Sequence, residues 1–410
     1  MIRNEIMKPL NIGLLREGRI PHDRRVALTP EHCLELIQRY PHIHIFVQPS
    51  HIRCFPDEDY ARLGFEITED LSNCDVLLGV KEVQMSTLLA NKTYFFFSHT
   101  IKKQLYNRSL LQTIVQKNIR LIDYECITDL EGNRMIAFGR YAGIVGAYNG
   151  VLTYGQRYGL FQLKRAYQCV NLEEVKAECE KIALPPIKIL ITGRGRVAKG
   201  AREMMSLMNI PEVTIDQYLY ETFTSPVYVQ LNSEDYHVHK QGKPFDNKHF
   251  HKHPEEYLSS FYRFTKVTDL LLACAYWHPS APLLFTKHRM KQATFKIKVI
   301  ADITCDINGS IPATMRASSI EDPFYDYNPQ TEQLDRAFVS EGNITLMAVD
   351  NLPGELPRDA SNDFGNILTN VIIPNLWNGD QDEIIERATI AKEGSLTPKF
   401  AYLQGYLEGE

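Results

Sequence analysis

Four ionisable side chains follow three short apolar runs, and together they could carry out acid–base chemistry. Lys81 and Glu82 come directly after one apolar run, His99 follows the next and Glu125 follows a third. A lysine beside a partly buried carboxylate can have its pKa tuned for proton transfer, and histidine titrates near neutral pH. If the runs are parallel strands, their carboxyl ends share the sheet edge where ligands bind. We therefore expect these four residues to be catalytic.

Each of these residues also has a plainer interpretation. Lys81 and Glu82 could be a solvated strand end, and His99 could be a core histidine satisfied by Ser98 and Thr100. The shared edge favours the catalytic interpretation, because perturbed ionisable groups gather at functional sites.

Arginines near the same runs could hold a carboxylate substrate. Arg25 stands just before the first expected helix, with Asp23 close by as an alternative ion-pair partner on the surface. Arg134 and Arg140 raise the same expectation, and Phe138 between them is assigned to the substrate site. Because guanidinium groups grip carboxylates through paired donors, several arginines suit a substrate with several carboxylates.

A glycine turn, Gly193-Arg194-Gly195-Arg196-Val197-Ala198, separates an apolar run at 187–192 from a helix-forming segment. Gly193 allows the tight turn, Gly195 lets the backbone approach phosphates, and Ala198 leaves room for close packing. The alternative is a glycine-rich connection between a core strand and a surface helix. The order of strand, turn and helix favours dinucleotide binding, with the helix N-terminus facing the pyrophosphate.

The choice between NAD and NADP is left open by the residues around this turn. Asp216 follows an expected strand at 212–215, a little over twenty residues after the turn, where an acid would bind the ribose hydroxyls of NAD. Arg194 and Arg196, however, could meet the 2′-phosphate of NADP.

Two further acids are assigned to the cofactor. Asp302 ends an apolar run at 299–303 and could contact the nicotinamide or its ribose, although a simple strand cap would explain it equally well. Asp350 begins a turn-rich crossing and is assigned in the same way.

The elements that must position these residues alternate between strands and helices. Thr29 is expected to cap a helix that starts at Pro30. Small and aromatic residues at 142–168 predict a long connecting helix, and a final apolar helix is expected at 364–373. Expected strands lie at 11–15, 44–47, 76–80, 93–97, 119–122, 187–192, 212–215 and 299–303.

This alternation predicts the α/β class, with two Rossmann-like, doubly wound parallel-sheet domains and a cleft between them. Residues 1–150 and 350–410 are expected to form a substrate domain, and 151–349 a dinucleotide-binding domain. The polar segment 225–254 contains five histidines and is interpreted as a solvated insertion, not as a metal site.

Composition excludes several classes of partner. The net charge of −5 gives no basic footprint for nucleic acid or an anionic membrane, and no apolar run reaches transmembrane length. The eight cysteines are scattered singly, so neither a zinc site nor a disulfide framework is predicted. With no signal-peptide pattern at the N-terminus, we expect a cytoplasmic protein that has small-molecule substrates and could form a homo-oligomer.

Several of these stretches resemble one known family. The longest is Lys92-Thr93-Tyr94-x-Phe96-Phe97-Ser98-His99-Thr100-Ile101-Lys102. Others are Arg24-Arg25 with Leu28-x-Pro30, Gly79-Val80-Lys81, Ile119 to Glu125, Ala137-Phe138-Gly139, Lys252 to Glu255 and Asp350 to Pro353. They resemble the lysine-ketoglutarate reductase domain of the bifunctional aminoadipic semialdehyde synthases. More distantly, they resemble fungal saccharopine dehydrogenases and the alanine dehydrogenase/transhydrogenase group.

The resemblance implies an NAD(P)-dependent saccharopine dehydrogenase of the L-lysine-forming type. Lysine and 2-oxoglutarate would condense to an imine, and hydride delivery would then give saccharopine. Lys81 and His99 match the two acid–base residues of the family, and Glu82 and Glu125 match acids that tune them. Arg25 and Arg134 match carboxylate-binding positions.

Two other functions compete with this one. An alanine-dehydrogenase-like enzyme would use a simple amino acid, and the segment 225–254 argues against it. A non-catalytic NAD(P)-binding regulator is disfavoured because Lys81, His99 and the glycine turn are all retained.

Overall fold

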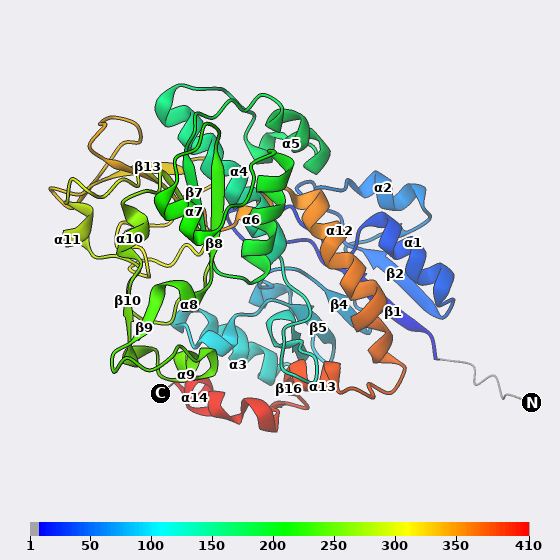
Figure 1. Ribbon diagram of the computed structural model, residues 1–410. Helices are drawn as coiled ribbons and strands as arrows, with labels where there is room; N and C mark the ends of the chain where they lie inside the picture. The colour runs from blue at the N-terminus through cyan, green and yellow to red at the C-terminus, as the bar shows by residue number, and fades with distance from the viewer. Residues whose placement is uncertain (1–7, 410) are drawn as a thin grey trace, which may run out of the picture. The chain divides into compact units, whose positions relative to one another are not determined.

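The computed structural model describes residues 8–409 and divides the chain into two compact units. Unit 1 comprises residues up to Ala137 together with those from Pro357 on, and unit 2 comprises Phe138–Leu356 (Figure 1). The crossings therefore fall at 137/138 and 356/357, whereas the sequence suggested boundaries near 150 and 350. The difference arises because the long helix that begins at Gly139 packs on the sheet of unit 2.

Unit 1 alternates short strands with helices, as its apolar runs predict. Thr29 caps the first helix through its side chain, and Pro30 is the first helical residue. The strands are β1 Leu10–Leu14, β2 Ile43–Val47, β3 Glu66–Ile67, β4 Val76–Leu78, β5 Thr93–Phe96, β6 Arg120–Asp123, β16 Thr389–Lys392 and β17 Ser395–Leu396. The α-helices are α1 Pro30–Arg39, α2 Asp57–Arg62, α3 Arg108–Gln116, α12 Pro357–Ile367, α13 Ile384–Ala388 and α14 Gln404–Glu408.

The sheet of unit 1 has the strand order β17-β16-β6-β5-β4-β1-β2-β3. The strands from β6 to β3 pair in parallel, and β16 adds to β6 in the antiparallel direction. The carboxyl ends of β1, β4, β5 and β6 therefore lie side by side at one edge of the sheet.

Unit 2 contains a second sheet dominated by parallel pairs, with the order β14-β13-β15-β12-β11-β7-β8. Its strands are β7 Lys188–Thr192, β8 Val227–Leu231, β11 Leu270–Ala273, β12 Val299–Asp302, β13 Phe324–Asn328, β14 Gln333–Asp335 and β15 Ile344–Met347. Its helices include α4 Gly139–Tyr158, α5 Leu172–Cys179, α6 Arg196–Leu207, α7 Ile215–Tyr220, α8 Ser233–Tyr236, α9 Asn247–Lys252, α10 Tyr262–Thr265 and α11 Lys287–Met290.

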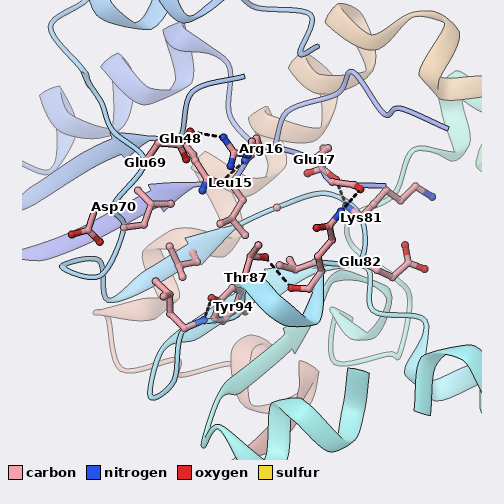
Figure 2. A pocket seen from close by; sticks show the side chains of 17 residues that line it. Leu15, Arg16, Glu17, Gln48, Glu69, Asp70, Lys81, Glu82, Thr87 and Tyr94 are labelled. Carbon is pink, nitrogen blue, oxygen red and sulfur yellow. Dashed lines mark hydrogen bonds and ion pairs between the residues drawn. The ribbon is translucent and has the colours of Figure 1, made fainter. Parts of the chain in front are cut away.

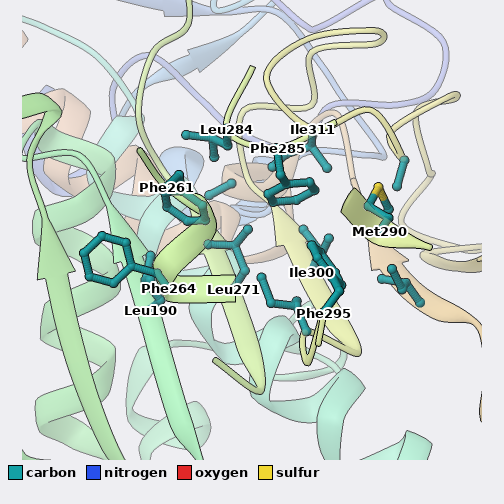
Figure 3. Packing of buried hydrophobic residues seen from close by; sticks show 14 of the residues in the cluster. Leu190, Phe261, Phe264, Leu271, Leu284, Phe285, Met290, Phe295, Ile300 and Ile311 are labelled. Atoms are coloured by element: carbon teal, nitrogen blue, oxygen red, sulfur yellow. The ribbon is translucent and has the colours of Figure 1, made fainter. Parts of the chain in front are cut away.

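One face of this sheet is covered by an aromatic core. Leu190, Leu271 and Ile300 project from three neighbouring strands, and Phe261 and Phe285 pack against them (Figure 3). The other face lies against α4, which contacts β11, β12 and β15. The two parallel-dominated sheets confirm the predicted α/β class with two Rossmann-like sheets.

Helices α4 and α6 cross at very close range because glycines stand at the contact. A β-carbon at Gly143 would lie 1.9 Å from the carbonyl oxygen of Val197, and one at Gly200 would lie 2.0 Å from that of Arg140. These two glycines allow the helix-on-helix contact, while Ala198 of α6 is fully buried.

Two expectations in unit 2 are wrong. Residues 212–215 do not form a core strand: Thr214 caps α7, and the strand beside β7 is β8. The segment 225–254 is not a single loop, because it contains β8 and a strand, β9 (His237–His239), that pairs with β10 (Tyr257–Ser259); residues 240–253 are exposed or partly exposed, as expected of a solvated segment. Its polar composition concealed both strands.

Among the helices that the structure describes, none combines the length and the hydropathy needed to cross a membrane.

Candidate functional site

The four predicted catalytic residues lie just beyond the carboxyl ends of neighbouring parallel strands in unit 1. Lys81 and Glu82 follow β4, His99 follows β5, and Glu125 follows β6. The sheet order therefore brings the strand ends together at the expected edge. This edge is where open α/β sheets bind ligands.

His99 and Glu82 form the closest pair of the group. The Nδ1 atom of His99 lies 2.5 Å from Oε1 of Glu82. Burial opposes ionisation of Glu82, but the hydrogen bond and charge of His99 hold its pKa below the ordinary value. When Glu82 is ionised and the ring is neutral, Nδ1 carries the proton and Nε2 keeps its lone pair. His99 is thus oriented as a proton acceptor.

The backbone around His99 reinforces that orientation. His99 itself has φ 52°, in the left-handed region that non-glycine residues seldom adopt, and its ring stacks on Phe97. The hydroxyl of Ser98 donates to Asp123 at 2.5 Å, which ties the end of β5 to the end of β6.

Lys81 has an amine suited to proton transfer near neutral pH. Burial, together with the nearby cation of Arg25, lowers the pKa of Lys81 to about 8. Among residues 8–409, no group hydrogen-bonds its Nζ atom. An amine with such a pKa can both accept and return a proton under physiological conditions.

Glu17 supports Lys81 from the end of β1. Its two carboxylate oxygens accept hydrogen bonds from the backbone N–H groups of Val80 and Lys81, at 2.7 and 2.8 Å. Burial and the neighbouring charge of Asp23 raise the pKa of Glu17 to about 8. The residue was not predicted, although it follows an expected strand just as the other acids do.

We expect Glu17→Gln to remove part of the pH dependence of stability. Because the folded pKa lies above the ordinary value of 4.5, Glu17 favours the fold fully below pH 4.5, and this contribution is lost as the pH rises through about 8. Urea unfolding from pH 5 to 8 should show a wild-type decline larger by about 3 kcal/mol than that of the variant. Glu69→Gln, at an exposed ion pair with Arg16, is the control. Equal slopes for wild type and Glu17→Gln would contradict the assignment.

Arg25 forms a buried ion pair with Asp23 instead of an exposed one. Its Nε and Nη2 atoms lie 2.9 and 2.5 Å from the two carboxylate oxygens, and each residue is only 2% exposed. Burial would raise the pKa of Asp23, but the charge and hydrogen bonds of Arg25 outweigh it and lower that pKa. The positive charge of Arg25 also helps to lower the pKa of the Lys81 amine.

Arg134 and Glu125 form a more open part of the edge. Arg134 lies 3.6 Å from Glu125 and above the ring of Phe97, and its side chain is 34% exposed. Lys102 approaches the other oxygen of Glu125 at 3.7 Å. Arg134 is therefore far more accessible to solvent than Arg25, the other residue that matches a carboxylate-binding position of the family.

A cavity opens beside Lys81 and Glu17 in unit 1. Figure 2 shows these two residues at one side of it, with Gln48, Thr87 and Tyr94 among the other lining residues. The lining is largely polar, so the cavity suits a charged or strongly hydrated ligand more than an apolar one.

The glycine turn of unit 2 has the features that a dinucleotide phosphate requires. Gly193 adopts φ 89°, and a β-carbon there would lie 3.0 Å from Cα of Ala275. Gly195 starts α6, where no side chain caps the first-turn N–H groups, and a β-carbon on it would enter open space. A helix N-terminus without a side-chain cap and with an open approach fits a bound pyrophosphate.

We expect Gly195→Ala to fold normally and to bind NAD(P)H at least tenfold more weakly. The new methyl would meet no protein atom within 4 Å but would occupy the space in front of the N–H donors. Thermal unfolding tests the first part, and fluorescence titration with NADH and NADPH tests the second. Unchanged affinity for both dinucleotides would show that the phosphates bind elsewhere.

The remaining predicted cofactor residues differ in their settings. Asp216 lies exposed in the first turn of α7, so its assignment to the ribose loses its basis. Both oxygens of the buried Asp302 accept hydroxyl hydrogen bonds, from Thr304 and Thr314 at 2.6 Å, which favours the strand-cap interpretation. Asp350 is exposed just beyond β15.

Two residues near the start of α4 were considered for the substrate. Phe138 directly precedes α4 and is partly buried. Arg140 makes a bidentate ion pair with Glu203, at 2.9 and 2.7 Å. Arg140 is therefore already engaged by a carboxylate of its own unit.

The histidines of the segment 225–254 include one compact group. His239, His249 and Glu256 place potential ligand atoms within 4.8 Å of one another. However, Nδ1 of His239 accepts a hydrogen bond from the backbone N–H of Gln241, so its proton resides on Nε2, which faces Glu256 at 3.3 Å. While Nε2 carries that proton it cannot bind a metal, and it makes no hydrogen bond to any described group.

Two comparisons relate the chain to alanine dehydrogenases. Residues 13–145 match the family model described as alanine dehydrogenase/PNT, N-terminal domain. The fold resembles that of a solved L-alanine dehydrogenase, with a TM-score of 0.66 at 16% identity, over 97% of this chain and 100% of that one.

The more specific resemblance is to the alpha-aminoadipic semialdehyde synthases, as the motifs predicted. The Arabidopsis thaliana protein of that name is 32% identical over 437 residues, covering 96% of this chain and 41% of the synthase. A saccharopine dehydrogenase [NAD(+), L-lysine-forming] from Yarrowia lipolytica is 23% identical, covering 88% of this chain and 90% of that protein. The chain thus spans less than half the length of the synthase, and the expected oxidoreductase class agrees with these names.

Proposed function

We propose that the chain is an NAD(P)-dependent saccharopine dehydrogenase of the L-lysine-forming type, acting on a CH–NH bond. The observation that carries the proposal is the convergence of Lys81, the His99–Glu82 pair and Arg134 at one sheet edge. Similarity to the semialdehyde synthases over almost the whole chain supports it.

Unit 1 would bind lysine and 2-oxoglutarate, and unit 2 would bind the dinucleotide. Gly193, Gly195 and the N-terminus of α6 would hold the pyrophosphate. When bound, the nicotinamide supplies the hydride that reduces the imine carbon. Arg134, half-open to solvent and only 3.6 Å from Glu125, would pair with a substrate carboxylate.

The side chains of unit 1 would move the protons. The lysine substrate must lose a proton before its amine attacks the keto carbon, and the carbinolamine oxygen must gain one to leave as water. Lys81, with its pKa near 8, and His99, with Nε2 unprotonated, are the two groups equipped for these transfers.

The experiment that tests the proposal follows NADH and NADPH absorbance separately with two substrate pairs. Oxidation of either cofactor with L-lysine plus 2-oxoglutarate is expected. Oxidation only with pyruvate plus ammonia would instead indicate an alanine-dehydrogenase-like enzyme. No oxidation with either pair, despite dinucleotide binding, would contradict the proposed reaction.

A further inference from the structure

The edge of unit 2 that holds the glycine turn also carries an ion pair for which the proposed reaction gives no role. Strands β7 and β8 pair in parallel, with Thr192 opposite Leu231. The residues that follow each strand are therefore neighbours. Nη1 of Arg194, in the turn, lies 3.6 Å from Oε1 of Glu234, which comes three residues after β8.

This place in the fold is where a dinucleotide is recognised beyond its phosphates. In a doubly wound sheet, the strand beside the glycine-turn strand ends near the adenosine ribose, where an acid binds the 2′-hydroxyl or an arginine accepts a 2′-phosphate. Two hydrogen bonds join the glycine turn after β7 to the end of β8. The N–H of Gly193 donates to the carbonyl of Leu231 at 2.7 Å, and Nε2 of Gln230 donates to the carbonyl of Gly193 at 2.6 Å.

Two other acids, Asp235 and Asp216, are less suited to bind the adenosine ribose. The carboxylate of Asp235 accepts the backbone N–H of Asn232 at 2.7 Å and so closes the turn after β8. Asp216 lies in the first turn of α7 and does not directly follow a strand. Arg194 and Glu234 are 57% and 41% exposed, so both charges remain accessible to a ligand.

We propose that the Arg194–Glu234 pair discriminates between NADH and NADPH at the 2′ position of the adenosine ribose. Glu234 would accept a hydrogen bond from the 2′-hydroxyl and repel a 2′-phosphate, while Arg194 would attract that phosphate. Because Glu234 forms an ion pair with Arg194, it also competes with a 2′-phosphate for the guanidinium group. The inference rests on the proposed dinucleotide binding, but not on the identity of the substrates.

Fluorescence titrations of the full chain with NADH and with NADPH test the inference without any turnover. Glu234→Gln frees Arg194 and should raise the affinity for NADPH relative to NADH by about tenfold. Arg194→Gln should lower the same ratio by about tenfold, as expected for one lost charge-assisted hydrogen bond. The double variant should return the ratio toward that of the wild type, because both opposing charges are then gone.

Two matched variants control for a general change of charge. Arg202→Gln removes an arginine of α6 that pairs with Glu212 away from the turn, and Asp216→Asn removes the acid on α7. Neither should alter the ratio. If both dinucleotides bind but neither Glu234→Gln nor Arg194→Gln changes the ratio, the pair is not the discriminator. If the unaltered chain binds neither dinucleotide, the proposed function fails and the inference fails with it.

Discussion

Lys81→Met is expected to reduce turnover by at least a hundredfold while leaving dinucleotide affinity within a few-fold of the wild type. The substitution keeps an apolar stem of similar length but removes the amine whose pKa burial and Arg25 lower to about 8. General acid–base catalysis contributes about 10²- to 10⁴-fold to the rate, so its loss should dominate kcat.

The pH profile separates this role from a structural one. The wild-type rate should show an ionisation near pH 8 that disappears in Lys81→Met. His99→Gln should also lower turnover strongly, because glutamine cannot accept the proton offered to Nε2. Lys102→Met, a lysine beside Glu125 at the same edge, serves as the matched control. Near-full turnover in Lys81→Met would refute the assignment.

The second large effect is expected on stability, from Gly200→Ala at the crossing of α4 and α6. Its β-carbon would lie 2.0 Å from the Arg140 carbonyl oxygen, a distance that requires the two helix backbones to move apart. Overpacking a close contact typically costs 1–3 kcal/mol and occasionally more, so we expect about 3 kcal/mol or greater here.

Thermal unfolding would show this as a clearly lower midpoint for Gly200→Ala. Gly143→Ala, on the facing helix, should behave similarly, because its β-carbon would meet the carbonyl oxygen of Val197. Gly195→Ala, at the open start of α6, should leave the midpoint unchanged. A midpoint for Gly200→Ala equal to that of Gly195→Ala would show that the crossing tolerates separation.

The sequence predicts most of unit 1 because its signals are local. Short apolar runs became β1, β2, β4, β5 and β6 within about two residues at each end, and Thr29 caps the helix as expected. The shared edge of Lys81, His99 and Glu125 follows from the parallel order alone. Glu17 was missed, although it follows β1 by three residues, just as Lys81 follows β4 and His99 follows β5.

The errors lie where local chemistry and tertiary context conflict. The stretch 212–215 has β-branched residues, but the side chain of Thr214 caps α7 and stops a strand there. Strand β8 is flanked by polar residues, and it was therefore hidden within the segment interpreted as solvated. The sequence allowed an ion pair between Arg25 and Asp23, but on the surface. Both side chains are buried, and this burial depends on tertiary packing that no local sequence pattern encodes.

The position of β16 at the edge of the unit 1 sheet has a consequence for biosynthesis. Its partner, β6, leaves the ribosome roughly 270 residues earlier, and all of unit 2 is translated in between. At roughly 5–20 residues per second, the backbone edge of β6 waits on the order of ten seconds or more before its own strand arrives. An unpaired edge invites pairing with other chains. Nascent chains are therefore most exposed to aggregation during this interval, and chaperone binding at β6 would protect them most.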